Sequence, residues 1–259
     1  MNETPELSAE EQDRYGWQLT VSDFGVEGQR RLKGTTVLIS RVGGVGGSVA
    51  LQLAAAGVGR LILAHSGNVR LNDLNRQLLM TTAGIGQPRI ESAERRLREL
   101  NPNVAIETVN ENVMESNAPA LVERCDIVVS AAPLFSERLL MNQEAVRQNK
   151  PMIDCAMYEL DGRLTTVLPG KTACLNCLTP EPPPNWKRQF PVFSAVSCTL
   201  GSLAAMEVIK VAAGFGVSLA GRLLVWDLAE MNFRTLSITR RRDCGCCGDA
   251  AMGADRLHS

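Results

Sequence analysis

The chain has 259 residues, and its 27 Lys and Arg against 28 Asp and Glu give a formal net charge of −1, so it has no bulk basic field to hold nucleic acid or anionic lipid. Hydrophobic residues make up 45%, as in a core-burying globular chain, and no apolar run approaches the roughly 20 residues that a membrane span needs. The first residues are acidic and polar, unlike a secretory signal, so we expect a cytoplasmic protein.

The first elements in chain order predict a βαβ unit behind an N-terminal helical segment, residues 1–34. Ser8 is a plausible N-cap and Glu11 completes a capping box. The predicted elements are a helix over 8–19, a loop and short helix over 21–33, a buried strand over 35–40, a glycine-rich turn over 41–47, a helix over 48–57 and a strand over 60–64. A strand, a glycine loop, a helix and a second strand indicate a parallel pair.

The next elements continue the alternation of strands and helices, and the last part of the chain departs from it. Predicted are helices over 87–100, 116–124 and 136–149 and strands over 104–109, 126–131 and 151–155. Beyond these, 162–168 is strand-like, 179–192 is proline-rich, 197–213 is a long apolar helix, and 222–228 with 233–239 form an antiparallel pair. The pattern predicts an α/β fold, a doubly wound Rossmann-like sheet with an antiparallel C-terminal part, spanning 35–248. Residues 249–259 are expected to be a disordered tail.

A glycine-rich loop follows the first predicted strand. Gly43 and Gly46 fit the G-x-G-x-x-G fingerprint, with Gly44 and Gly47 beside them, but Arg41 stands where the first glycine belongs. Main-chain N–H groups of such a loop, with a helix N-terminus near Gly46, favour a phosphate. A turn that only joins a strand to a helix is the alternative.

Two further residues near this loop, His65 and Arg76, each have a functional and an ordinary interpretation. The acidic residue that usually binds a ribose hydroxyl after the second strand is absent, and His65 is compatible with a ribose contact or with an ordinary strand end. In Asn75-Arg76-Gln77, Arg76 can pair bidentately with a polyphosphate, but taken alone a solvated loop charge explains it better.

The eight cysteines, without a secretory signal, argue for metal binding or chemistry rather than disulfides. The pairs Cys174/Cys177 and Cys244/Cys247 predict a tetrahedral zinc site, which is structural because four thiolates leave no position for water. A redox pair or an iron–sulfur cluster is the alternative. Cys246 is interpreted as a bystander between ligands.

The other cysteines are interpreted mainly as packing residues. Cys198 stands at the start of an apolar helix, where a thiol can become a nucleophile, but its apolar neighbours favour a packed small residue. Cys125 and Cys155 lie in or beside buried strands and are expected in the core.

These motifs, in this order, resemble the ubiquitin-E1-like activating enzymes, the superfamily that includes MoeB, ThiF and HesA. The resemblance runs from about residue 7 to residue 248 and rests on Arg14-Tyr15, Gly43–Gly46, Ala56–Gly59, Asp73–Gln77, Gly86–Arg89, Asn101-Pro102, Pro169-Gly170, Gly201–Lys210 and the two cysteine pairs. Through residues 65–69 and 181–196 the chain is most similar to the HesA group, which is associated with nitrogen-fixation gene clusters.

The resemblance implies a homodimer that binds ATP with Mg²⁺ and adenylates the C-terminal glycine carboxylate of a small β-grasp partner protein. It implies that His65 lies near the ribose and that Arg76 and Arg89 act as catalytic cations. The phosphate-binding residues implied are Gly43, Gly44, Gly46, Arg76, Gln77 and Arg89.

The chain departs from the superfamily pattern at several functional positions. The arginine that reaches the neighbouring subunit's phosphates falls on Trp17, the ribose aspartate on His65 and the catalytic lysine on Arg89. The Mg²⁺ aspartate falls on Pro133, which offers no ligand. In the crossover loop, where some members carry a thioester-forming cysteine, this sequence has Lys187 or its neighbours, and that role is not carried over to Cys198.

The leading hypothesis is a HesA-type, adenylyltransferase-like ATP-binding protein in metallocofactor (nitrogenase or molybdenum) or sulfur-transfer maturation. The departures motivate an alternative, a catalytically degenerate scaffold that binds a partner or delivers metal. A dinucleotide-dependent oxidoreductase is disfavoured by the zinc pairs and the missing ribose acid. No nucleic-acid or membrane partner is expected.

Overall fold

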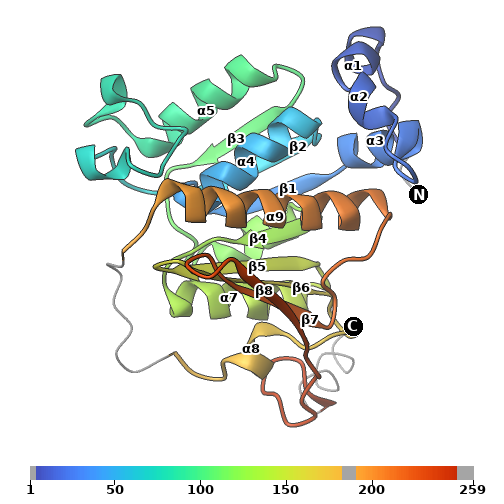
Figure 1. The fold of residues 1–259 in the computed structure, drawn as a ribbon, viewed down its shortest axis with the longest axis vertical. Helices are drawn as coiled ribbons and strands as arrows, with labels where there is room; N and C mark the ends of the chain where they lie inside the picture. The colour runs from blue at the N-terminus through green and yellow to red at the C-terminus, as the bar shows by residue number, and fades with distance from the viewer. Residues whose placement is uncertain (1–3, 183–190, 250–259) are drawn as a thin grey trace.

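The computed structural model describes residues 4–182 and 191–249, and within them one eight-stranded sheet forms the centre (Figure 1). Its strand order is β3-β2-β1-β4-β5-β6-β7-β8. The strands are β1 (Thr36–Ser40), β2 (Arg60–Ala64), β3 (Ala105–Val109), β4 (Ile127–Ser130), β5 (Met152–Tyr158), β6 (Asp161–Val167), β7 (Arg222–Asp227) and β8 (Asn232–Ser237). The predicted tail, apart from Asp249, and Lys187 lie outside the described residues.

The helices connect these strands and cover the sheet. They are α1 (Ala9–Arg14), α2 (Gly16–Leu19), α3 (Gly25–Lys33), α4 (Gly44–Ala56), α5 (Arg89–Leu100), α6 (Ala118–Glu123), α7 (Phe135–Arg147), α8 (Leu175–Leu178) and α9 (Ser194–Ala213), with 3-10 turns at Leu71–Asp73 and Thr82–Gly84. All helices and strands predicted between residues 35 and 239 are present within a few residues of their expected bounds, and α8 is a short addition.

The sheet is parallel on one side and antiparallel on the other. Neighbouring strands from β3 through β5 run parallel, with Val37 opposite Leu61 and Ile127, and β5 to β8 pair antiparallel. The chain moves outward from β1 to β3 and then returns to β4 beside β1. This reversal opens a crevice at the carboxyl ends of β1 and β4, the place where open α/β sheets bind ligands.

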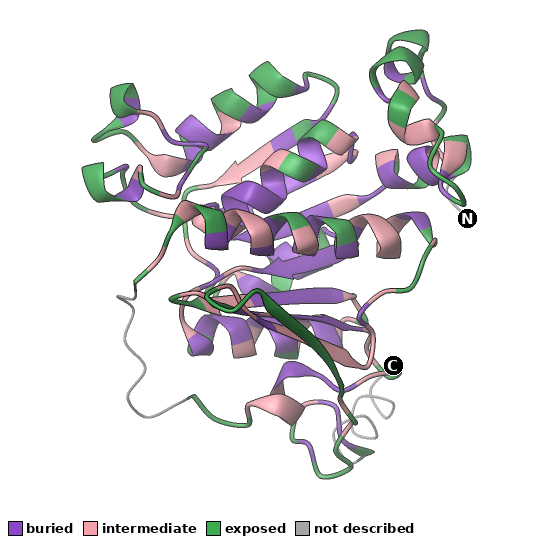
Figure 2. Ribbon diagram, viewed as in Figure 1, coloured by how far each residue is buried: buried purple, intermediate pink, exposed green. Residues whose placement is uncertain are grey.

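Two apolar cores lie on opposite faces of the sheet, as a doubly wound fold requires. Residues of α4, α5 and α9 pack with Ile39, Leu63 and Val129 on one face. Residues of α6 and α7 pack with Leu38 and Val128 on the other. Because both faces are covered, β1, β2 and β4 are continuous apolar runs, and Figure 2 shows this part of the sheet as buried.

Helix α9 is long and apolar enough to meet the length and hydropathy test for a membrane span. Its Leu200, Ala204 and Val208 are buried against α4 and the sheet, as in the core helix of a globular domain. Its apolar composition therefore reflects packing inside this fold.

The predicted N-terminal helix is divided in two at Tyr15. Ser8 and Glu11 form the expected capping box, with Ser8 N donating to Glu11 Oε2 at 2.7 Å. Tyr15 is buried and its hydroxyl accepts a hydrogen bond from Asn101 Nδ2 at 2.8 Å, which ties this turn to the end of α5. Gly16, a weak helix former, then starts a separate short turn.

Candidate functional site

A pocket lies at the carboxyl ends of β1, β2 and β4, with an enclosed volume of about 160 Å³. Its wall brings together most of the nucleotide-site residues predicted from the sequence: Gly43, Gly44, His65, Arg76, Gln77 and Arg89. Pro133 and Arg138, which follow β4, complete the opposite wall. The topology therefore gathers into one crevice residues that are almost 100 positions apart in the chain.

The glycine loop turns directly into α4, which begins at Gly44 rather than near Gly46 as the sequence suggested. Gly43 is the N-cap, so the free N–H groups of the first helical turn begin at the pocket wall. Gly46 is not part of that wall. A Cβ there would lie 2.4 Å from the carbonyl oxygen of Arg41, so Gly46 permits the close turn.

Arg41 occupies the position of the first fingerprint glycine and adopts a left-handed conformation, with φ of 62°. Its Nε and Nη2 donate to both carboxylate oxygens of Glu137, the shortest at 2.7 Å, and both side chains are buried. The guanidinium is thus held against α7, while Arg41 also lines the pocket. Glu137 was not foreseen, because 96 residues separate it from Arg41.

Asp73 organises the polar wall formed after β2. This buried carboxylate accepts hydrogen bonds from Arg89 Nη2 at 2.6 Å, from Gln77 Nε2 at 2.8 Å and from the backbone N–H of Arg70 at 2.9 Å. Arg76 Nη1 donates to Asn72 O and Asn75 Oδ1, and its Nη2 lies 3.8 Å from Asp73 Oδ1. Asp73 is itself part of the pocket wall and positions Arg89 and Gln77 there.

A second buried ion pair lies deeper, between α7 and β5. Arg138 Nε and Nη2 donate to the two carboxylate oxygens of Asp154 at 3.0 and 2.6 Å, and both side chains are almost fully buried. Burial alone would lower the pKa of Arg138, but the charge and hydrogen bonds of Asp154 raise it overall. Arg138 thus stays charged at the pocket wall.

The pocket does not fit a protein-held Mg²⁺. Among the described residues of its wall, Asp73 is the one acidic side chain, and both of its oxygens already accept hydrogen bonds. Pro133, to which the sequence resemblance assigns the position of the Mg²⁺ aspartate, lies in the wall and has no side-chain oxygen.

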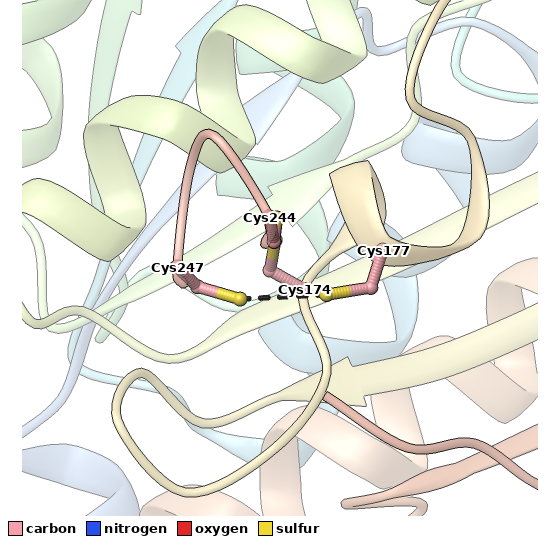
Figure 3. A group of neighbouring side chains, drawn as sticks. All are labelled: Cys174, Cys177, Cys244 and Cys247. Carbon is pink, nitrogen blue, oxygen red and sulfur yellow. Dashed lines mark hydrogen bonds between the residues drawn. The ribbon is translucent and has the colours of Figure 1, made fainter. Parts of the chain in front are cut away.

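Four cysteines converge beside α8 (Figure 3). The sulfur atoms of Cys174, Cys177, Cys244 and Cys247 lie within 4.8 Å of one another, with Cys174 to Cys244 at 3.7 Å and Cys177 to Cys247 at 3.4 Å. Zn–S bonds of about 2.3 Å in a tetrahedron place sulfurs about 3.8 Å apart. The cluster therefore fits a tetrahedral metal ion.

Asn142 of α7 holds both cysteine segments in place. Its Oδ1 accepts from Leu175 N at 2.9 Å, and its Nδ2 donates to Asn176 Oδ1 and to Cys246 Sγ. Cys246 lies beside the four-cysteine group but is not a member of it, as predicted. A hydrogen bond with Cys246 lowers the pKa of Cys174 to about 4, which favours the thiolate that a metal requires.

The remaining predicted residues lie away from the pocket or in the core. Cys125 and Cys155 are buried as expected, and burial raises the pKa of Cys125 to about 12. Cys198 is half-buried, with its sulfur 3.5 Å from Ser194 Oγ. The Trp17 side chain, on α2, is 93% exposed and does not enter the pocket.

Comparisons with known proteins identify the family of the chain. The ThiF family model matches residues 15–247. Protein HesA (heterocyst) of Trichormus variabilis is 44% identical over 95% of this chain and 92% of its own length. The sulfur carrier protein adenylyltransferase of Thermus thermophilus is 38% identical over 93% of this chain and 92% of its own.

Solved structures show the same fold. Escherichia coli MccB crystallised with ATP superposes with a TM-score of 0.80 at 24% identity, over 91% of this chain and 74% of MccB. These matches cover both the part of the chain that contains the glycine loop and the part that contains the four cysteines. The chain therefore belongs to the ThiF family of E1-like proteins, in which HesA proteins and sulfur carrier protein adenylyltransferases are its relatives.

Proposed function

We propose that this chain is an ATP-dependent adenylyltransferase of the HesA, ThiF and MoeB type, which activates the carboxyl terminus of a small protein or peptide. The observation that carries the proposal is the meeting of the glycine loop with Arg76, Gln77 and Arg89 in one pocket at the reversal of the sheet. Supporting it, one relative is named for adenylating a sulfur carrier protein, and MccB has been crystallised with ATP and with MccA.

In this proposal, different pocket residues bind different parts of the nucleotide. Amides of the first turn of α4 bind phosphate oxygens, since they have no partner within the helix. Arg76 and Arg89 supply positive charge, Gln77 a polar contact, and His65 lies toward the ribose. The enclosed 160 Å³ is smaller than the roughly 300–1,000 Å³ of most ligand pockets, so part of the nucleotide lies along the open rim.

This arrangement supports a reaction at the α-phosphorus of ATP. A carboxylate oxygen of the partner attacks the α-phosphorus of ATP, a P–O bond forms, and the bond to the bridging oxygen breaks so that pyrophosphate leaves. Arg76 and Arg89 stabilise the charge that develops on the phosphate oxygens. Asp73 fixes Arg89 by two hydrogen bonds, so little reorganisation is needed during the step.

The cysteine cluster has a structural role in this proposal. Four thiolates would complete the coordination of one zinc ion and leave no position for a water molecule. The ion would link Cys174 and Cys177, after β6, to the C-terminal Cys244 and Cys247. Zinc supplies no chemistry to the nucleotide pocket.

We place the protein in metallocofactor or sulfur-transfer maturation in the cytoplasm, acting as a homodimer. The name of the relative called sulfur carrier protein adenylyltransferase supports the sulfur-transfer part of this proposal. Light scattering after size-exclusion chromatography is expected to give a mass near twice the 28.1 kDa of the chain. A monomer over the micromolar range would contradict the dimer.

The second candidate is a degenerate scaffold that binds a nucleotide or partner without chemistry. It is favoured by the pairing of Arg41, Arg89 and Arg138 with carboxylates and by Pro133 at the Mg²⁺ position. These pairs reduce the net positive charge that the pocket offers to a triphosphate.

Exchange of labelled pyrophosphate into ATP, with a candidate carboxyl-terminal partner protein, separates the two functions. The adenylyltransferase predicts sustained exchange in the wild type and a loss of about 100-fold or more in Arg89→Ala. Arg98→Ala is the matched control, because Arg98 lies on the same helix and pairs with Glu94 at the surface. A wild type that binds ATP but exchanges no pyrophosphate would support the scaffold.

A further inference from the structure

Cys246 is a fifth cysteine beside the four-cysteine cluster and is not one of the four that fit a tetrahedral ion. It lies between Cys244 and Cys247 in the C-terminal segment and is half-buried. Its sulfur accepts a hydrogen bond from Asn142 Nδ2 at 3.3 Å and makes another with the sulfur of Cys174. Its side chain is therefore held against the cluster by α7.

The two cysteines of the first C-x-x-C pair differ in what lies next to their sulfurs. Cys174 is fully buried, and its sulfur hydrogen-bonds with the side chains of Cys246 and Cys247. Cys177 is half-buried, and its sulfur lies 3.4 Å from that of Cys247 and accepts from the backbone N–H of Arg241 at 3.4 Å. The fifth thiol thus stands next to Cys174, whereas the neighbours of the Cys177 sulfur are Cys247 and a backbone amide.

Asn142 interacts with both of these neighbouring sulfurs. Its Nδ2 donates to Cys246 Sγ, and its side chain also hydrogen-bonds with Cys174. Its Oδ1 accepts from the backbone N–H of Leu175, which fixes the amide so that its NH₂ group faces the cysteines. Hydrogen bonds to an ionised acceptor are stronger than those to a neutral one. The same amide can therefore stabilise a thiolate at Cys174 or at Cys246.

Five cysteines around a site for one ion offer more than one complete set of ligands, because zinc takes four thiolates. A cysteine must lose its proton to bind the ion. If Cys246 replaces Cys174, the bond from zinc to Cys174 breaks, a bond to Cys246 forms, and the proton passes from Cys246 to Cys174. The total charge of ion and ligands is unchanged by this replacement. The hydrogen bond between the two sulfurs joins the two groups that exchange the proton.

We propose that Cys246 is a substitute ligand for Cys174, so that the site holds its metal ion through either of two sets of four thiolates. In the first set, each of the two cysteine segments provides two ligands. In the second set, Cys177 alone remains from the segment at α8, and Cys244, Cys246 and Cys247 provide the other three. The ion then stays bound while its attachment to the α8 segment falls from two bonds to one. The inference rests on the proposed metal site and not on the nucleotide chemistry.

The test compares Cys174→Ala with Cys177→Ala in the full chain, since each variant removes one ligand of the same C-x-x-C pair. Zinc is measured by elemental analysis after dialysis against a competing chelator. Cys174→Ala is expected to keep about one zinc per chain, as the wild type does, because Cys246 completes the set. Cys177→Ala, and the double variant Cys174→Ala with Cys246→Ala, are expected to keep less than about a tenth of that zinc. In Cys174→Ala loaded with cadmium-113, NMR should correlate the metal with the β-protons of Cys246.

Cys174→Ser is a second form of the test, because its hydroxyl can still accept from Asn142, and it should keep zinc that is lost when Cys246→Ala is added. Cys198→Ala removes a half-buried cysteine outside the cluster and should bind zinc as the wild type does. The proposal is overturned if Cys174→Ala and Cys177→Ala lose zinc equally, or if the double variant keeps as much as Cys174→Ala. A correlation that is absent at Cys246 would also overturn it.

A wild type that binds no zinc would overturn the proposed metal site together with this inference. Loss of zinc from Cys174→Ala alone, with a zinc-bound wild type, would overturn only the substitute ligand. Calorimetry with ATP on Cys174→Ala, expected to match the wild type, reports on the nucleotide pocket separately.

Discussion

At the scale of single residues, the most unusual feature is an arginine in a conformation that glycine adopts without strain. Arg41 has a φ of 62° and is held by two-point contact with the buried Glu137. Removing one partner of a buried ion pair costs about 3–5 kcal/mol, because the other charge stays buried and unpaired. Relief of the left-handed conformation offsets about 1 kcal/mol of that cost.

We therefore expect Arg41→Gly to lower the free energy of unfolding by about 2–4 kcal/mol, measured by urea denaturation. The double variant Arg41→Gly with Glu137→Leu is expected to recover most of this loss, since no buried charge is left. A double variant no more stable than Arg41→Gly would show that the pair does not account for the strain at this position.

A substitution at Asp73 should show how the position of Arg89 affects ATP binding, separately from any effect on folding. Asp73→Asn keeps the shape of the side chain but loses the charge that holds Arg89. We expect ATP binding to weaken about tenfold or more, measured by calorimetry, because Arg89 is no longer oriented. Glu94→Gln, which removes the surface pair with Arg98, serves as control and should bind ATP as the wild type does.

Some of the residues in these contacts could be predicted from the sequence and others could not. The glycine loop and Arg76-Gln77 are recognisable because spacing within a short segment encodes them. Glu137 and Asp154 were not foreseen, because their roles depend on arginines that only the folded sheet brings to them. Nothing in the local sequence of α7 distinguishes Glu137 from a surface acid.

At the scale of elements, Glu11 of the N-terminal capping box is expected to make the stability of the protein depend on pH. Burial raises the pKa of Glu11, but the hydrogen bonds from Lys33 and Ser8 outweigh it, and the net shift is downward. A carboxyl whose pKa is lower in the folded state contributes stability at pH values above its unfolded pKa, about 4.3. That contribution is lost as the pH falls through the folded pKa.

Glu11→Gln should therefore be less stable than the wild type by about 1 kcal/mol at pH 7, and the difference should shrink below about pH 4. Urea unfolding at several pH values measures it. Glu10→Gln, an exposed neighbour, should show a much smaller difference at pH 7. A difference between Glu11→Gln and the wild type that does not change with pH would refute the ionic origin.

Helix boundaries were predictable where a cap or a glycine defines them. Gly57, with φ of 81°, ends α4, and Pro88 and Asn101 delimit α5 as expected. The break at Tyr15 was not predictable, because it depends on a hydrogen bond to Asn101, 86 residues away. Likewise β5 continues to Tyr158, beyond the predicted 155, because β6 pairs with it along its whole length.

At the scale of the whole molecule, the four-cysteine cluster links the C-terminal segment to the strand end that precedes α8. We expect Cys177→Ser to lose bound zinc, measured by elemental analysis, and to unfold at lower urea concentration, because metal binding contributes directly to folding. Cys246→Ser should retain about one zinc per chain. Equal metal loss in both variants would make Cys246 a ligand.

The strand order of the whole sheet follows from general rules more than from local sequence. Alternating strands and helices predicted the parallel half, and the late strand pair predicted the antiparallel half. The cavity at the end of β5 could not be foreseen, because it is lined by residues of β5 to β8 that only the folded sheet brings together.

The central claim is that the crevice at the ends of β1 and β4 binds ATP. Calorimetric titration with ATP tests it, with Gly44→Val as the perturbation, since a Cβ there would lie 2.9 Å from Ser197 Oγ at the pocket wall. Gly16→Ala, where a Cβ meets open space, is the control. The account predicts a wild-type dissociation constant between about 1 µM and 1 mM, at least tenfold weakening in Gly44→Val and no change in Gly16→Ala. No binding by the wild type at millimolar ATP, or equal binding by all three proteins, would contradict it.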